Sequence, residues 1–379
     1  MSAEMEEGAM QSQFDVAVVG AGVSGLVCAQ ALRQQGHSVV VLEKSRGLGG
    51  RLATRRLPHA FADHGVRCLQ VQGNLSQQLI QTLAARAVIQ PWVTAIEEWS
   101  PFGISAGLDI QHYGSPNGIT AAAKFLSTGL EIYRGQRVQS VAFGSTWELM
   151  LEAASGERMP NVRAKALVVA IPAPQALLLL EPLANIGAGL PTDRLPPGDF
   201  WAKLRSPTFN ACITAIATYP SSLALPAWKA LTASQDAEIA WISFDQSKSP
   251  GAIDPVLVVQ SNAAFAEQHR EAEDLSAIGQ HLLSRVKELI PQLPSPDLLQ
   301  VHRWRYAFAR NPLAEPYLTA APLPLVCAGD WCGGRQIESA LQSGLAAAAA
   351  IAHQLGTSMA DSEDSFSELI FSKLLNGIN

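Results

Sequence analysis

The sequence predicts an α/β fold of two packed domains, because 379 residues are too many for one small domain and three stretches carry clear patterns. Residues 14–43 read as a buried strand, a glycine-rich turn, a helix and a second strand, the order of a parallel βαβ unit. Residues 325–355 repeat the order of strand, turn and helix. Residues 212–260 hold short alternating segments, which are typical of an antiparallel sheet.

The composition indicates a large core and excludes several classes of protein. Hydrophobic residues make up 48% of the chain and charged residues 16%, which is too apolar for a disordered protein. The net charge of −6 argues against a nucleic-acid partner, which would require a basic face. No run of about 20 apolar residues and no secretory signal is present, so we expect no membrane span and a cytoplasmic location. Five scattered cysteines without a CxxC pair fit a reducing compartment, and the histidines show no metal-ligand spacing.

The first unit carries the motif Gly20-x-Gly22-x-x-Gly25 between its first strand and its helix. Such glycines permit the tight turn, the approach of a pyrophosphate to the backbone, and close packing of helix on strand. The anion would lie at the helix N-terminus. Glu43 ends the second strand, where its carboxylate is placed to accept the hydroxyls of an adenosine ribose. The predicted nucleotide-binding residues of this unit are Gly20, Gly22, Ser24, Gly25, Glu43 and Lys44.

The later elements follow from local patterns. Apolar periodicity predicts helices over residues 75–89, 117–126, 271–290 and 337–355. Alternation or short apolar runs predict strands over residues 137–141, 147–152, 164–170 and 325–328. Residues 92–102 look like sheet or loop, and the Gly- and Pro-rich residues 183–209 read as a connection between domains. Residues 356–379 form an acidic, Ser-rich tail with one further helix expected over 366–375.

A second glycine-rich run decides between NAD and FAD, which share the first motif. Gly49-Gly50-Arg51, with Thr54, precedes Asp63-His64-Gly65, and this run resembles the extended dinucleotide motif of the flavoprotein superfamily that contains amine oxidases, carotenoid desaturases and renalases. The resemblance implies noncovalent FAD, with Gly50 and Arg51 near its pyrophosphate or pyrimidine edge. No second GxGxxG exists, so no separate NAD(P)H domain is expected.

The C-terminal unit agrees with a flavin. Gly329 and Asp330 follow the strand, and Ile337 opens the helix. In the superfamily that it resembles, the aspartate binds the ribityl chain and the helix N-terminus faces the flavin C2 carbonyl, where a helix dipole stabilises negative charge. Glu338 serves either this site or only the first turn of the helix. Val138 is also assigned to the cofactor.

The closer resemblance is to renalase-like proteins, over residues 16–351. It rests on the motifs above together with Tyr113-Gly-Ser-Pro-Asn-Gly118, Trp241, Phe244-Asp245-x-Ser247-Lys248 and His302-Arg303-Trp304-Arg305-Tyr306-Ala307. It implies oxidation of an isomeric dihydronicotinamide nucleotide, with oxygen as acceptor and hydrogen peroxide as product. The expected partners are therefore a small-molecule substrate and oxygen. The run Val66-Arg67-Cys68-Leu69 departs from the family, which carries a small residue and aromatics there, and this puts substrate choice in question.

Three residues are predicted to work in catalysis: His64, Trp304 and Arg303. Hydride transfer from a dihydronicotinamide needs orientation and charge rather than an acid or base on the protein. If residues 302–307 form a strand, Arg303 and Arg305 share one face and Trp304 points to the other, so not all three can line one site.

Three alternatives stay open. An amine oxidase would need an aromatic cage and a lysine near the flavin, for which Lys203 and Lys248 are candidates. A desaturase or isomerase acting at a lipid surface would need a large apolar patch. A flavin-binding protein that has lost its chemistry would fit the altered run at 66–69.

We therefore expect a discontinuous FAD-binding Rossmann-type domain and a mostly antiparallel α+β substrate domain, with the flavin ring at their junction. The FAD-binding domain is assigned residues 14–70, 110–175 and 300–355. The substrate domain is assigned residues 71–109 and 176–299, and residues 1–13 and 356–379 are assigned to tails.

Overall fold

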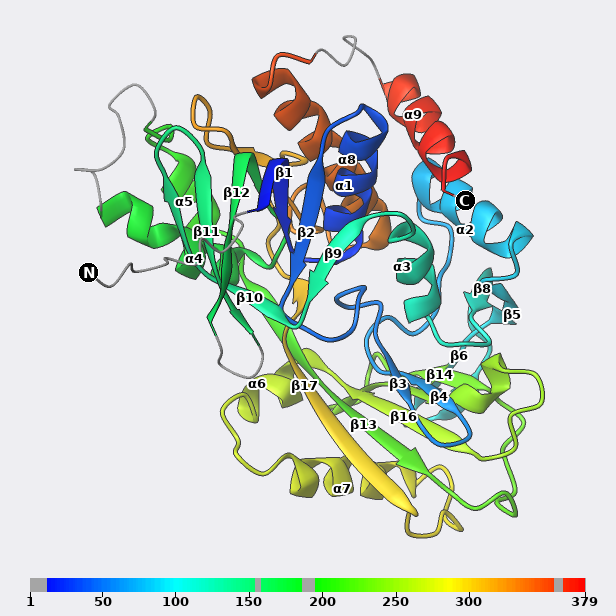
Figure 1. The fold of residues 1–379 in the computed structure, drawn as a ribbon. Coiled ribbons are helices and arrows are strands. Elements are labelled where there is room, and N and C mark those ends of the chain that lie inside the picture. The colour runs from blue at the N-terminus through cyan, green and yellow to red at the C-terminus, as the bar shows by residue number, and fades with distance from the viewer. Residues whose placement is uncertain (1–11, 154–157, 186–194, 358–363, 379) are drawn as a thin grey trace, which may run out of the picture.

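The computed structural model describes residues 12–153, 158–185, 195–357 and 364–378, and its two large sheets confirm the predicted α/β fold (Figure 1). The first sheet has the strand order β10-β11-β12-β1-β2-β9, and β19 extends it on β12. Its strands are β1 (Ser12–Val19), β2 (Val39–Glu43), β9 (Glu131–Arg134), β10 (Gln136–Phe143), β11 (Trp147–Ala153), β12 (Arg158–Val169), β18 (Leu318–Thr319) and β19 (Leu325–Cys327).

The centre of this sheet is parallel and buried on both faces. β1 pairs in parallel with β12 and β2, and β19 pairs in parallel with the end of β12. Val16 and Val18 point to one face and Ala17 and Val19 to the other, as the period of a strand requires. The near-continuous apolar run that predicted β1 is therefore explained by helices on both sides.

Helices cover the two faces. One face packs against α1 (Val23–Gln34), α2 (Asn74–Ala85), α3 (Thr120–Leu126), α8 (Ile337–Gln354) and α9 (Asp364–Asn376). The other face packs against α4 (Ala173–Asn185) and α5 (Phe200–Arg205), together with the β10–β11 hairpin. The helices α1 and α8 approach closely because Gly344 has no side chain: a Cβ there would lie 2.6 Å from the carbonyl oxygen of Ser24.

The second sheet lies below the first in Figure 1 and is mostly antiparallel. Its strand order is β17-β13-β16-β15-β14-β6-β7, and α6 (Ala263–Gln268) and α7 (Leu275–Val286) cover one face. The strands are β6 (Glu97–Ser100), β7 (Gly103–Ser105), β13 (Phe209–Thr218), β14 (Ala230–Thr232), β15 (Ile239–Phe244), β16 (Val256–Ser261) and β17 (Leu298–Ala309). Smaller pairs are β3 (Thr54–Arg56) with β4 (Phe61–Asp63), and β5 (Gln90–Ala95) with β8 (Asp109–Gly114); a 3₁₀ turn, η2, spans Asp245–Lys248.

Several segments lie on a different side of the predicted domain boundary. β17 pairs with β13 in the second sheet, although residues 300–309 were assigned to the FAD-binding domain. The helix α2 joins the core of the first sheet through Leu75, Leu79 and Leu83, and α4 and α5 also pack there. The expected C-terminal helix forms as α9, and its Phe371 is fully buried in the same core. Residues 186–194 of the predicted connection lie outside the described residues.

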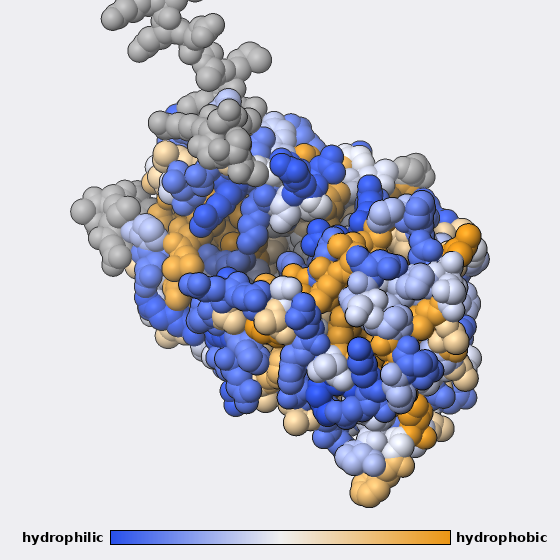
Figure 2. Space-filling model, turned by 90° about the horizontal axis from the view of Figure 1, so that it is seen from below, coloured by the Kyte–Doolittle hydropathy of each residue, from blue (hydrophilic) through white to orange (hydrophobic). Residues whose placement is uncertain are grey.

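Among the described residues, no helix has the length and apolar content to cross a bilayer. Figure 2 views the molecule from below, where apolar residues form several patches separated by hydrophilic ones. The most exposed large apolar side chain is Phe102, at the turn between β6 and β7, with 97% of its surface accessible.

Candidate active site

The N-terminus of α1 forms one corner of the site. Gly20 has a φ of 105°, and a Cβ there would lie 2.6 Å from the carbonyl oxygen of Ala170, so this turn requires glycine. At Gly25 a Cβ would lie 2.1 Å from the carbonyl oxygen of Gly20, which is why the helix can pack on the strand. At Gly22 a Cβ would meet nothing within 4 Å, so open space lies beside the backbone. Gly22 is the N-cap residue of α1, and no side chain of the described residues caps the helix there, which leaves its first N–H groups for an anion.

Glu43 is fixed at the end of β2 by the backbone. Its Oε2 accepts a hydrogen bond from the Ala21 N–H at 2.9 Å, and its Oε1 accepts one from the Ser45 N–H at 2.8 Å. Each carboxylate oxygen keeps a further lone pair for a ribose hydroxyl. Ser24 is buried in the first turn of α1, whereas Lys44 is exposed.

The second glycine-rich run lies directly against the first. The Gly49 N–H donates to the Ala21 carbonyl at 2.9 Å, and a Cβ on Gly50 would lie 3.4 Å from the Cα of Gly22. Both Gly49 and Gly50 have positive φ, 101° and 57°. The two runs therefore build one wall of backbone, with few side-chain atoms between them.

Arg51 reaches from this wall to the C-terminal motif. Its guanidinium forms two hydrogen bonds with the Asp330 carboxylate and a third, of 3.0 Å, with the carbonyl of Ala307. Asp330 is nearly buried, and its neighbour Gly329 donates its N–H to Ser343 Oγ at 2.9 Å. The two predicted motifs thus meet in space, although the assigned contacts of Arg51 and Asp330 with a cofactor stay predictions.

The N-terminus of α8 is joined to that of α2 by Glu338. The Glu338 carboxylate accepts hydrogen bonds from the N–H groups of Leu75 and Ser76, at 3.1 and 2.7 Å. Glu338 therefore caps α2, which is a contact that the sequence pattern did not reveal. Ile337 is partly buried at the first position of α8. Val138 is buried on β10, in the cluster that contains α4 and α5.

A cluster of rings formed by His64, His302 and Trp304 lies beside the loop after β4. The rings of His64 and Trp304 are stacked, with centroids 5.4 Å apart, and His302 meets both rings edge-on. Trp304 Nε1 donates to the His64 carbonyl at 2.8 Å, and Thr214 Oγ1 donates to the same oxygen at 3.0 Å. We call His64, His302 and Trp304 the ring cluster.

His64 is neutral at physiological pH. Burial, together with the neighbouring His302 and Arg55, lowers the pKa of His64 to about 3. Its Nδ1 is buried and has no hydrogen-bond partner among the described residues. The imidazole can therefore offer a lone pair or an N–H, but no charge.

Arg303 does not join the ring cluster. Its guanidinium donates to the carbonyls of His269 and Ala272, and Arg305 forms an ion pair with Glu271, so both arginines contact the connection between α6 and α7. The structure therefore does not bring Arg303 together with His64 and Trp304, and its predicted catalytic role stays a prediction. The alternation of a strand places Arg303 and Trp304 on opposite faces of β17.

Asp63, Asp245 and Lys248 form a buried group of charges that no sequence pattern predicted. Lys248 Nζ lies 2.9 Å from Asp245 Oδ1 and 3.2 Å from Asp63 Oδ2, and it donates to the carbonyl of Arg67 at 2.7 Å. Burial lowers the pKa of Lys248, but the two carboxylates outweigh it and the net shift is upward. The segments that contain Asp63 and Lys248 each stand out in the sequence, but the two residues are 185 positions apart and no local pattern encodes their pairing.

A dinucleotide fits the glycine wall. Open space at Gly22, an uncapped helix start and a carboxylate with free lone pairs occur together, as the pyrophosphate and ribose of FAD require. Cys332 is buried with its thiol pKa raised by burial, so it is not a reactive thiolate for covalent attachment.

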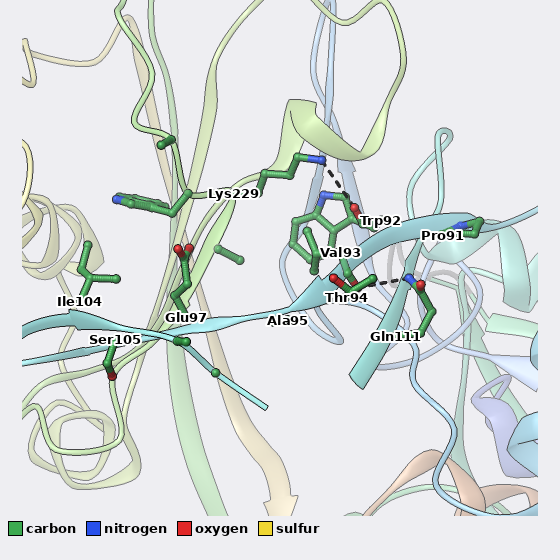
Figure 3. A pocket seen from close by; sticks show the side chains of 15 residues that line it. Pro91, Trp92, Val93, Thr94, Ala95, Glu97, Ile104, Ser105, Gln111 and Lys229 are labelled. Carbon is green, nitrogen blue, oxygen red and sulfur yellow. Dashed lines mark hydrogen bonds between the residues drawn. The ribbon is translucent and has the colours of Figure 1, made fainter. Parts of the chain in front are cut away.

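A pocket of about 670 Å³ lies elsewhere, between β5, β6, β7 and the residues before β14 (Figure 3). Its lining includes Trp92, Glu97 and Lys229, and Lys229 Nζ donates to the Trp92 carbonyl at 3.5 Å. None of the predicted site residues lines it. Trp92 bounds the pocket and also contacts the buried charges, because its ring centroid lies 5.0 Å from Lys248 Nζ.

Two family models match the chain. The model described as an NAD(P)-binding Rossmann-like domain matches residues 18–83, and the model described as flavin containing amine oxidoreductase matches residues 105–352. The chain is also similar to the flavin-containing monooxygenase FMO GS-OX-like 2 of Arabidopsis thaliana, with 63% identity over 35 residues. That stretch covers 9% of this chain and spans only 8% of the monooxygenase's own length.

Solved structures resemble the chain over most of its length. Cyclohexylamine oxidase from Brevibacterium oxydans IH-35A has a TM-score of 0.65 and 16% identity, covering 90% of this chain and 99% of its own. A putrescine oxidase bound to putrescine has a TM-score of 0.61 and 15% identity, covering 90% of this chain and 100% of its own. At such low identity, these likenesses establish the fold.

Proposed function

Since the chain belongs to the family of flavin-containing amine oxidoreductases and has FAD as its cofactor, we propose that it is a renalase-type oxidase. In this proposal an isomeric dihydronicotinamide nucleotide gives up a hydride, and oxygen with one further proton takes up the electrons to give hydrogen peroxide. The oxidised nicotinamide is the other product. FAD, when bound, supplies the acceptor for the hydride.

The charge around the ring cluster is the observation that carries this proposal. Burial is the largest cause of the lowered His64 pKa, and Arg55 is the charged side chain that also acts on it, because the pKa of the neighbouring His302 is itself lowered and leaves that ring neutral. A positive environment attracts an anionic nucleotide and opposes an ammonium group. It therefore favours a nucleotide hydride donor over a cationic amine.

The two candidate lysines support the same choice. Lys203 lies on the surface and pairs with Asp199 and Glu315. Lys248 is buried, and its ammonium is occupied by two carboxylates and a carbonyl. Neither offers the available lysine that amine oxidation would need.

The protein's part in the proposed reaction is orientation rather than proton transfer. Trp304 Nε1 and Thr214 Oγ1 both hold the His64 carbonyl, which fixes the backbone of this loop. The His64 and Trp304 rings stack on each other, and in this proposal a nicotinamide ring packs on the outer face of the partly exposed Trp304 ring. Hydride transfer from such a donor requires no general base.

An amine oxidase remains the second candidate, favoured by one observation. The fold is shared with a cyclohexylamine oxidase and a putrescine oxidase over about nine tenths of the chain. Their substrates are amines by name, and the aromatic ring of Trp304 would suit an amine as well as a nicotinamide.

One experiment separates the two candidates. The yellow holoprotein is mixed anaerobically with 2- or 6-dihydro-NAD, and the visible flavin absorption is recorded. We expect the donor to bleach the flavin rapidly and stoichiometrically. Admission of air should restore the colour and produce one equivalent of hydrogen peroxide. Bleaching by cyclohexylamine or putrescine, and none by either dihydronicotinamide, would replace the proposal with amine oxidation. Ordinary 4-dihydro-NAD serves as the matched control for non-specific reduction.

A further inference from the structure

Arg67 stands in the run where the sequence departs from the renalase pattern, and its surroundings are unusual for an arginine. It is partly buried, and its guanidinium lies over the Trp241 ring, with Cζ 4.7 Å from the ring centroid. Its Nε donates to Gln260 Oε1 at 2.5 Å. Gln260 Nε2 in turn donates to the carbonyls of Gly65 and His64, at 2.8 and 3.3 Å, so the amide is fixed with its oxygen toward Arg67.

The positive charge of Arg67 has no counter-charge within the described chain. Arg67 forms no ion pair with any described carboxylate, and Nε is the one guanidinium nitrogen with a hydrogen-bond acceptor among the described residues. The nearby carboxylates of Asp63 and Asp245 are taken by Lys248. The adjacent thiols cannot neutralise it, because burial raises the pKa of Cys68 to about 11 and also raises that of Cys212.

A largely buried cation without a counter-charge is costly, and natural proteins pair such groups or use them to hold a ligand. Arg67 is only partly buried, and its terminal nitrogens are not among the fully buried polar atoms that lack a partner in the described chain, so a ligand can reach them. The planar guanidinium is anchored on one edge by Gln260 and on one face by Trp241, which leaves its two terminal nitrogens. Two parallel N–H donors match the geometry of a carboxylate or phosphate. The same loop carries His64, three residues earlier, in the ring cluster.

We propose that Arg67, positioned by Gln260 and Trp241, binds an anionic group of the substrate, a phosphate or a carboxylate. The proposal rests on the proposed function in placing a substrate at the ring cluster, and it adds which residue binds the anionic group of that substrate. Phosphate fits a dihydronicotinamide nucleotide, whereas carboxylate would fit an amino acid.

The first test compares two hydride donors that share a ring and differ in charge. These are 6-dihydro-NAD and a 1-methyl-6-dihydronicotinamide, which has no phosphate. In the wild-type enzyme we expect a lower KM for the nucleotide. In Arg67→Gln we expect this KM to rise about 10- to 100-fold, the effect of losing a hydrogen bond to a charged group. The KM for the phosphate-free donor and both kcat values should change little.

Arg305→Gln is the matched control, because Arg305 is exposed and paired with Glu271 on the opposite face of β17. It removes the same charge and should leave both KM values unchanged. Arg67→Lys keeps the positive charge but lacks the two parallel N–H donors of the guanidinium, so its KM for the nucleotide should be intermediate. Equal KM values for the two donors in the wild-type enzyme, or equal effects of Arg67→Gln on both, would overturn the proposal.

The second test needs neither turnover nor a folded variant. The wild-type holoprotein is titrated with inorganic pyrophosphate, with acetate and with chloride at constant ionic strength, while flavin absorption and fluorescence are followed. Saturable perturbation by pyrophosphate alone identifies a phosphate site, and perturbation by acetate alone identifies a carboxylate site. Absence of any saturable response beyond chloride overturns the proposal. Because this readout is independent of the donor, failure of every dihydronicotinamide to bleach the flavin would remove the proposed function and leave the anion site tested on its own.

Discussion

Arg51 and Asp330 are joined by two hydrogen bonds, Nη1 to Oδ2 at 2.8 Å and Nη2 to Oδ1 at 2.5 Å, across 279 positions of the chain. This bidentate ion pair connects the second glycine-rich run to the turn before α8. Both segments are predicted to border the FAD, and the ion pair sets the distance between them.

Breaking that pair should weaken FAD binding more than it weakens the fold. In Arg51→Gln the Asp330 carboxylate loses its partner, and the predicted FAD site loses both the Arg51 cation and the ion pair that joins its two segments, so we expect FAD affinity to fall about 10- to 100-fold. Flavin content after dialysis and titration of apoprotein with FAD measure this. Arg205→Gln breaks an exposed pair with Glu181 and should retain full flavin content. Full retention by Arg51→Gln would show that the pair is only structural.

Glu338 should matter through α2. In Glu338→Ala the N–H groups of Leu75 and Ser76 lose their acceptor, and a lost cap of this kind costs about 1 kcal/mol in the free energy of unfolding. Urea denaturation of the holoprotein measures the loss. Glu181→Ala, at an exposed surface pair, is the control. An unchanged midpoint in Glu338→Ala would mean that water replaces the carboxylate at no cost.

Lys248 should be the most sensitive of the charged residues. In Lys248→Met two buried carboxylates are left without their cation, and breaking a buried ion pair costs about 3–5 kcal/mol. We expect a large fall in the urea midpoint or failure to fold. Lys203→Met removes an exposed lysine that also has two acidic partners and should have little effect. Comparable losses in the two variants would contradict the assigned burial of the Asp63–Lys248–Asp245 group.

The lowered pKa of His64 predicts a pH dependence of stability with a definite sign. Between pH about 3, where the folded protein takes up this proton, and about 6.5, where the unfolded chain does, the unfolded state binds more protons. Stability therefore rises with pH across this window and levels off above it. His64 alone should lower the free energy of unfolding by about 2 kcal/mol at pH 5 relative to pH 7.5.

His64→Gln should flatten that dependence. Urea unfolding at pH 5 and pH 7.5 measures the difference for each protein. His59→Gln, at an exposed histidine, should keep the wild-type slope. An identical slope in His64→Gln would mean that the His64 imidazole is more accessible to protons than its burial indicates.

The local parts of the fold were predictable, and the long-range parts were not. Gly20, Gly22, Gly25 and Glu43 have fixed spacing within one βαβ unit, so the backbone chemistry of that unit is encoded locally. The placement of β17 depends on pairing with β13, about 90 positions earlier in the chain, and each strand pattern is equally compatible with either sheet.

In the candidate site, too, local features were predictable from the sequence and long-range contacts were not. The alternation of a strand predicted that Arg303 and Trp304 point apart, and the structure places them so. Which of the two faces meets His64 could not be read from alternation, because that depends on which side of β17 is covered by α6 and α7. Lys248 was visible as a candidate, but its two carboxylate partners were not.

The position of β12 between β1 and β19 has a consequence for synthesis of the chain. Val18 of β1 pairs with Val168, and Leu167 pairs with Leu325, so the parallel sheet joins early, middle and late segments. At translation rates of about 5–20 residues per second, one edge of β1 stays open for about 8–30 seconds until β12 has been made. During this time its apolar run Val16–Val19 is available to chaperones or to other nascent chains. Asp330, the partner of Arg51, is made later still, so the ion pair that joins the two glycine-rich motifs can form only after most of the chain has been made.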